Sequence, residues 1–195
     1  IGFFFLIVVN WFIGMLKLIH LYGGMNIPST FLCIKDLEEI YNNGTKNEKP
    51  FVGEQISKQN DVDINLSKTF IGAPKENNVI EEMITNMEKL FLIDTTNESK
   101  FLDKIPKYLN MIKSNEEINT IDGEKLGLYD DESNLIDVHD MLSSNDNIEL
   151  NDLALGINIP LEEIMISKRY QWFSKLSPDE ICLLYTSPSP RDVRS

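Results

Sequence analysis

The chain has 195 residues and a formal net charge of −13, with 42% hydrophobic and 25% charged residues. A chain of this length can bury one hydrophobic core. The acidic balance argues against a nucleic-acid partner, because phosphate binding needs clustered lysine and arginine. Cys33 is the one cysteine before residue 182, so the sequence predicts neither an internal disulfide nor a thiolate metal site.

Residues 1–24 are the most apolar part of the chain, and Ile1 to Leu16 carries no charged residue. A membrane-spanning helix needs about 20 apolar residues, and tryptophan, tyrosine and lysine suit its ends. Three interpretations are open: a transmembrane or signal segment, an untranslated leader ahead of Met25, and a helix buried in the core. We favour the first, which makes a membrane a partner of Ile1 to Tyr22. A start at Met25 would instead predict a cytoplasmic protein.

The next segment predicts a helix, a polar stretch and a short strand. The helix opens at Pro28 and stops at Asn43-Gly44, with an apolar side formed by Phe31, Ile34, Leu37 and Tyr41. Residues 44–59 are polar. Residues 62–66 alternate between apolar and polar side chains, which is typical of a strand. Gly72-Ala73-Pro74 is expected to end it.

Two amphipathic helices are predicted in the middle of the chain. The first covers 78–93, with Asn78 as N-cap, Glu81 completing a capping box and a broad apolar stripe. The second opens at residue 95 and runs to about residue 112. Pro106 lies inside it, so we expect a kink or a break there.

The remaining pattern predicts short helices at 134–142 and 151–156, and a longer one that begins at Pro160. The predicted fold class is therefore mainly α. We expect an irregular bundle of four to six amphipathic helices with at most a minor short strand pair, plus a separate N-terminal apolar helix.

The C-terminal residues differ in composition from the rest. Arg191 and Arg194 follow a chain whose other arginine is Arg169, and prolines lie beside them. Residues 182–192 resemble a translated sequencing-library adapter rather than a protein family. We therefore expect three parts: an apolar segment at 1–24, an acidic domain at 25–181 that is truncated at its C-terminus, and an adapter-derived artefact at 182–195.

Few residues predict chemistry. Asp137, His139 and Asp140 are weak candidates for a metal or catalytic site, because a histidine lies beside carboxylates. They cannot all share one helical face. No calcium loop, nucleophile elbow or phosphate loop is present, so no cofactor is predicted. Tyr170, Trp172 and Phe173 cluster aromatic side chains near Lys168-Arg169 and are candidates for a protein-partner patch.

The first functional hypothesis is a non-catalytic interaction or scaffolding domain, tethered to a membrane by its N-terminal segment. The second is the N-terminal fragment of a larger enzyme whose catalytic region lies beyond Ile181. A helix start at Ser177-Pro178 motivates this alternative, because the chain changes composition as that helix opens. A metal-dependent hydrolase that uses the weak metal candidates is the third hypothesis.

Overall fold

The computed structural model describes four stretches of backbone, which are residues 2–57, 63–93, 98–136 and 149–158. Side chains are described for residues 10–56, 65–90, 104–136 and 149–158. The described residues all belong to one compact unit, which ends at Asn158.

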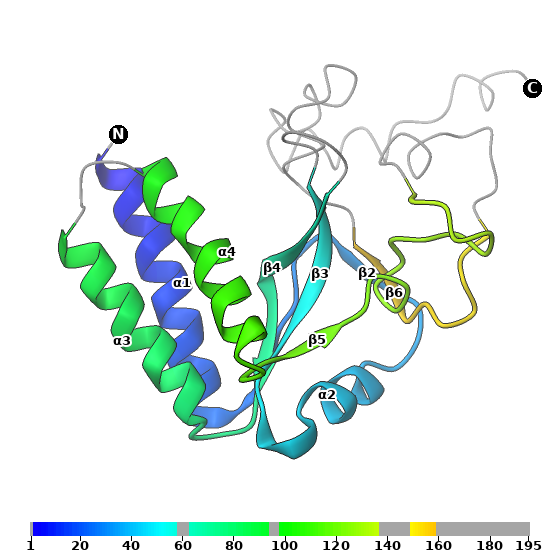
Figure 1. Ribbon diagram of the computed structural model, residues 1–195, viewed down its shortest axis with the longest axis horizontal. Helices are drawn as coiled ribbons and strands as arrows, with labels where there is room; N and C mark the ends of the chain where they lie inside the picture. The colour runs from blue at the N-terminus through cyan, green and yellow to red at the C-terminus, as the bar shows by residue number, and fades with distance from the viewer. Residues whose placement is uncertain (1, 58–62, 94–97, 137–148, 159–195) are drawn as a thin grey trace, which may run out of the picture. The chain divides into compact units, whose positions relative to one another are not determined.

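The described chain contains both helices and strands, which are interspersed along the sequence (Figure 1). The α-helices are α1 (Gly2–Tyr22), α2 (Glu38–Gly44), α3 (Asn78–Ile93) and α4 (Glu98–Ser114), and a 3-10 turn, η1, covers Lys46–Glu48. The strands are β1 (Gly24–Asn26), β2 (Phe31–Cys33), β3 (Phe51–Ser57), β4 (Asp63–Ala73), β5 (Asn119–Ile121) and β6 (Gly156–Asn158).

Four of the strands form one mixed sheet in the order β1-β4-β3-β5. The pairs β1–β4 and β4–β3 are antiparallel, whereas β3 and β5 run parallel. The parallel pair requires a long crossover, and α3 and α4 lie within the connection. Strands β2 and β6 form a separate antiparallel pair, in which Cys33 lies opposite Gly156.

A bulge sets the register of the central pair. Val52 lies opposite Ile71 and Glu54 opposite Leu66, so that Gly53 alone faces the residues between. The buried Ser67 lies in this bulge, and its Oγ accepts hydrogen bonds from the backbone N–H groups of Phe70 at 3.1 Å and Thr69 at 3.3 Å. The serine therefore satisfies donors that the interrupted ladder leaves free.

One face of this sheet is covered by α1, α3 and α4, which lie side by side in Figure 1. The helices contribute apolar residues at spacings of three and four, such as Ile80, Met83, Ile84 and Met87 of α3. Val52 and Ile71 of the sheet contact this cluster from the other side. We call this cluster the helical core.

The opposite face carries a second apolar cluster, and its residues come from α2, the sheet, the segment after β5 and Leu155. Its members are Ile40, Phe51, Ile56, Phe70, Ile121, Leu126, Leu128 and Leu155. Because successive residues of a strand point to opposite faces, Phe70 enters this cluster while Ile71 enters the helical core. The central strands are therefore buried on both sides.

The mainly α prediction is wrong. The described residues combine four α-helices with a four-stranded mixed sheet and a two-stranded sheet, which is an α/β fold. The polar stretch expected at 44–59 contains β3. Gly53 and Glu54 interrupt its apolar pattern, yet the strand is held by pairing with two neighbours that are distant in sequence.

One strand pair replaces the first part of the helix predicted from Pro28 and includes the last residue of the helix predicted at 151–156. The segment after Pro28 forms β2 before the seven-residue α2 begins, and residues 156–158 form β6. Phe31 and Asn158 pair with each other across the chain. This long-range pairing overrides the local helical pattern, because strand preference depends on cross-strand neighbours.

The predictions for the central helices are closer to the structure. A helix at Asn78–Ile93 is confirmed as α3. Its cap, however, is Asn77, whose Oδ1 accepts hydrogen bonds from the N–H groups of Val79 and Ile80. The helix α4 continues through Pro106 without a break.

The close packing at the bulge predicts an asymmetry between two glycines. A Cβ on Gly53 would lie 2.7 Å from Leu126 and 2.9 Å from the ring of Phe70, whereas a Cβ on Gly14 in α1 would have no heavy atom within 4 Å. Gly53→Ala should therefore lower the free energy of unfolding by about 1–3 kcal/mol. Gly14→Ala should raise it by roughly 0.5–1 kcal/mol, because alanine favours a helix. Urea unfolding measures both, and equal effects would contradict the bulge geometry.

Candidate functional site

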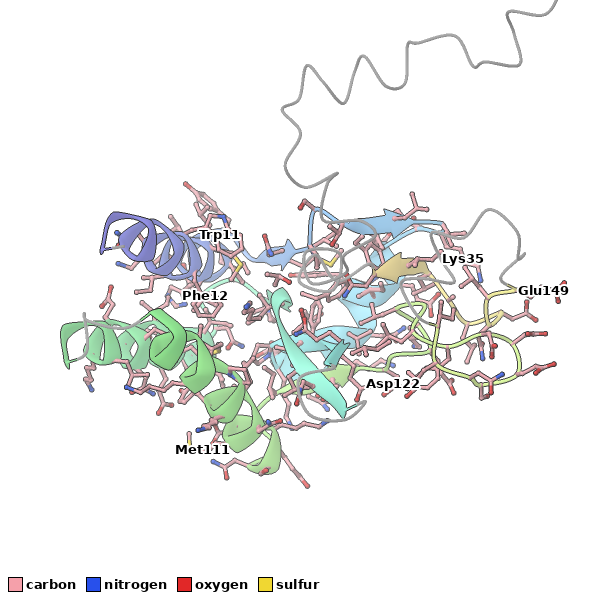
Figure 2. The ribbon with its side chains drawn as sticks, turned by 90° about the horizontal axis from the view of Figure 1, so that it is seen from above. Trp11, Phe12, Lys35, Met111, Asp122 and Glu149 are labelled. Atoms are coloured by element: carbon pink, nitrogen blue, oxygen red, sulfur yellow. The ribbon has the colours of Figure 1, made fainter. Side chains whose placement is uncertain are left out.

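The helix α1 is apolar on two sides, and only one of them is buried. Phe12 and Leu16 belong to the helical core, and Leu16 is fully buried. Trp11 and Leu18 remain 50% and 61% exposed. Figure 2 shows Trp11 on the side of α1 that points away from α3 and α4, and Phe12 on the side toward them. An apolar helix surface normally packs against another element, so the outer side lacks the cover that the inner side has.

The outer side has a defined set of residues, which we call the docking face. It consists of Trp11, Gly14, Leu18, Leu21 and Tyr22. Its large side chains are all at least half exposed, and Tyr22 reaches 73%. A groove of about 800 Å³ runs along it, lined by Asn10, Trp11, Gly14, Met15, Leu18, Ile19, Tyr22, Gly23, Met25 and Asn26.

The far end of the groove is positioned by a glycine turn. Gly23 has a φ of +73°, which favours glycine, and its N–H donates to the carbonyl of Ile19 at 2.8 Å to close the helix. The chain then enters β1, where Met25 pairs with Gly72. The side-chain amide of Asn26 donates to the carbonyl of Thr69. These contacts tie the end of the groove to β4.

The start of α3 is tied to the same region. The Nδ1 atom of His20 lies 3.1 Å from the carbonyl oxygen of Asn77, and the N–H of Glu76 donates to the carbonyl of His20 at 2.7 Å. These contacts fix the end of α1 against α3. The docking face is thus part of a rigidly anchored helix.

The groove has no charged residue among those that line it. Lys17 lies beside the docking face, but its Nζ is 2.6 Å from a carboxylate oxygen of Glu88 on α3, and both side chains are about half exposed. An exposed pair of this kind contributes little to stability. The lining is therefore suited to an apolar occupant.

Two acidic residues, Asp130 and Asp36, have structural roles among the described residues. One oxygen of Asp130 accepts the N–H of Asn134 at 2.7 Å, and the other accepts its side-chain amide at 3.1 Å. Asp36 accepts the N–H of Glu38 at the start of α2. Within the described residues, no three histidine, cysteine or acidic side chains are grouped so that they could hold a metal ion.

A second hollow of about 460 Å³ lies beside α2 and is lined by Lys35, Asp36, Glu38, Glu39, Asn42, Asn43 and Leu155. Its lining is mostly charged or amide. The ammonium group of Lys35 donates to the carbonyl of Asp152 at 2.5 Å. Because a backbone carbonyl already holds the ammonium group of Lys35 and the lining offers little apolar surface, this hollow is the weaker candidate.

The site residues predicted from the sequence all lie outside the described part of the chain. The metal candidates Asp137, His139 and Asp140 lie outside the described residues, and so do Tyr170, Trp172 and Phe173. The transmembrane prediction for residues 1–22 is wrong. Among the described residues, no helix is long and apolar enough to cross a bilayer. Phe12, Leu16 and Ile19 are apolar because they fill the helical core.

The docking face was only partly visible in the sequence. The sequence predicts that a tryptophan and a tyrosine lie at the ends of a membrane helix, whereas Trp11 and Tyr22 belong to this exposed face. Gly14, Leu18 and Leu21 were missed, because an almost entirely apolar helix has no polar stripe to mark its outer side. The spacing from Trp11 through Gly14 and Leu18 to Leu21 is three, four and three residues, and this pattern could have identified one face.

Comparisons of the chain with protein-family models, with curated proteins and with solved structures find no match.

Two leucines of α1 provide a matched test of which side is buried. Leu16→Ser should lower the free energy of unfolding by about 3 kcal/mol or more, because it removes a fully buried side chain. Leu18→Ser should change it by less than about 1 kcal/mol. Urea unfolding measures the free energy of unfolding of both variants. A large decrease in Leu18→Ser would mean that this leucine is packed in the folded chain.

The contacts of Asp130 predict its titration. The backbone N–H of Asn134, and more weakly its side-chain amide, favour the carboxylate and hold the pKa of Asp130 below its usual value of 3.8. The stabilisation is present above pH 3.8 and is lost as the pH falls further. Asn134→Ala should raise the pKa only part of the way, because the backbone N–H remains. A carboxyl titration by NMR measures this, and an unchanged or fully restored pKa would contradict it.

Proposed function

We propose that this chain is a non-catalytic protein-interaction module and that the docking face of α1 is its contact surface. The observation that carries the proposal is the concentration of exposed apolar side chains on one helix side. Four of the eight large hydrophobic side chains that are exposed among the described residues belong to α1, namely Trp11, Leu18, Leu21 and Tyr22. Isolated exposed apolar residues are ordinary, whereas a contiguous set is typical of an interaction site.

The residue types support a protein partner. Tryptophan and tyrosine are enriched at the energetic centres of protein interfaces. Fully burying one large apolar side chain contributes about 1.5–3 kcal/mol, and each of these is half or more exposed. The four together therefore offer several kcal/mol, and part of it is offset by the entropy lost on association. A moderate affinity follows.

The site differs from the one that the sequence predicted. The sequence placed a partner patch at Tyr170, Trp172 and Phe173, which lie outside the described residues. The docking face replaces them as the candidate because its exposure and its anchoring to β4 and α3 are described. An interaction module needs such a rigid presentation, since ordering a flexible surface would oppose binding.

Site-specific photo-crosslinking tests this proposal. A photoreactive amino acid is placed at Leu21, which is 52% exposed on the docking face, or at Met111, which is 51% exposed on α4. In extracts of cells that encode the protein, we expect a discrete protein adduct from position 21. Position 111 should give none, and the position-21 adduct should disappear when Trp11→Ser is added.

The proposal is overturned by three results: no adduct from position 21, the same adduct from both positions, or an adduct that persists in the Trp11→Ser variant. Circular dichroism of each variant confirms that the fold is retained, which is expected because Trp11 lies outside the helical core.

A further inference from the structure

The docking face has the spacing of a helix-binding seam. Trp11, Gly14, Leu18 and Leu21 follow one another at intervals of three, four and three residues. In packed helices, apolar residues at this spacing form one straight seam, and each side chain enters a hole between residues of the facing helix. The inner side of α1 contacts α3 and the helical core, so the outer seam is available to a further helix.

Gly14 provides the hole. A Cβ built at this position has no heavy atom within 4 Å, and the residue lines the groove between Trp11 and Leu18. Any larger residue would fill this space. A leucine or similar side chain from a facing helix can therefore enter above the α1 backbone, with Trp11 on one side and Leu18 on the other.

The charge of the chain selects among helical partners. The groove lining is uncharged, but the whole chain has a net charge of −13. The helix α3, which packs against α1, contains Glu81, Glu82 and Glu88 against the single cation Lys89. Lys17 at the border of the docking face is already paired with Glu88. A partner with lysine or arginine beside its apolar seam is attracted by this field.

The same charge disfavours the other occupants. A second copy would bring another 13 negative charges to the interface, and an anionic membrane surface would also repel the chain. A neutral helix would fit the groove but would gain nothing from the carboxylates of α3. Shape and charge thus favour the same class of partner.

We propose that the docking face binds a basic amphipathic helix of a partner protein, with apolar side chains at alternating three- and four-residue spacing flanked by lysine or arginine. This inference rests on the proposed function, because it names the partner of the same face. The apolar seam of the partner helix lies along the docking face, and one of its side chains fills the space above Gly14.

Two designed peptides serve as probes. Both carry leucine at the seam positions over about three heptads, and they differ only in having lysine or glutamate at the flanking positions. Binding is followed by the fluorescence of Trp11 in a Trp172→Phe chain, so that a single tryptophan reports. We expect the lysine peptide to bind at least about tenfold more tightly than the glutamate peptide in low salt, and this ratio should shrink in high salt.

Gly14→Leu separates seam binding from general attraction of a cationic peptide to an acidic protein. The substitution leaves the charge unchanged and suits a helix, but it fills the hole. We expect it to weaken lysine-peptide binding by at least about tenfold, with unfolding stability equal to or above that of the unchanged protein. Met111→Ser, at an exposed position on α4, is the control and should leave binding unchanged.

Each other outcome overturns the inference. Equal binding of both peptides would show that the partner need not be basic. Unchanged binding to the Gly14→Leu variant would show that the partner does not lie along the seam. A dimer in sedimentation that Gly14→Leu dissociates would identify a second copy as the occupant. Binding to phosphatidylcholine or phosphatidylserine vesicles in place of the peptides would identify a membrane. If no peptide binds while the crosslink at Leu21 persists, the proposed function stands and the helical partner is wrong.

Discussion

Two neighbouring residues of β4, Phe70 and Ile71, are both fully buried although they point to opposite faces of the sheet. Each face therefore needs its own cover, and the layers of the fold follow from this requirement. Three helices cover one face, and α2 with the segment after β5 covers the other. The bulge opposite Gly53 fixes which residue faces which cluster, since a shift by one residue would exchange the two sets.

The cover on the helical side explains the chemistry of α1. Its inner residues must be apolar to fill the helical core, and they occupy one side of the helix. Nothing in that requirement makes the outer side apolar, yet Trp11, Leu18 and Leu21 lie there with a glycine between them. An outer side that served only the fold would carry polar residues. The apolar outer side is therefore the part of α1 that the fold does not account for.

The sequence predicted structure well where local pattern and final contacts agree. The helix predicted at 78–93 is confirmed as α3, and the alternation predicted at 62–66 overlaps β4 from Asp63 onward. The prediction failed where contacts between residues distant in sequence determine the secondary structure. Phe31 joins a strand because Asn158 lies beside it, and Phe51 because Gly72 and Asn119 flank it, and no local pattern encodes such partners. The candidate site was not predicted as a protein surface, since the sequence places the partner patch at Tyr170, Trp172 and Phe173. An almost uniformly apolar helix does not indicate which side stays exposed.

The pairing of β2 with β6 also bears on how the chain is synthesised. Cys33 is made early, whereas Gly156, which lies opposite it, leaves the ribosome only after every strand of the larger sheet. Until then the edge of β2 has no partner, with Leu32 and Ile34 beside it. Such delayed, non-local contacts slow folding and leave a nascent chain open to wrong associations. The small sheet can therefore form only after the larger sheet has been synthesised in full.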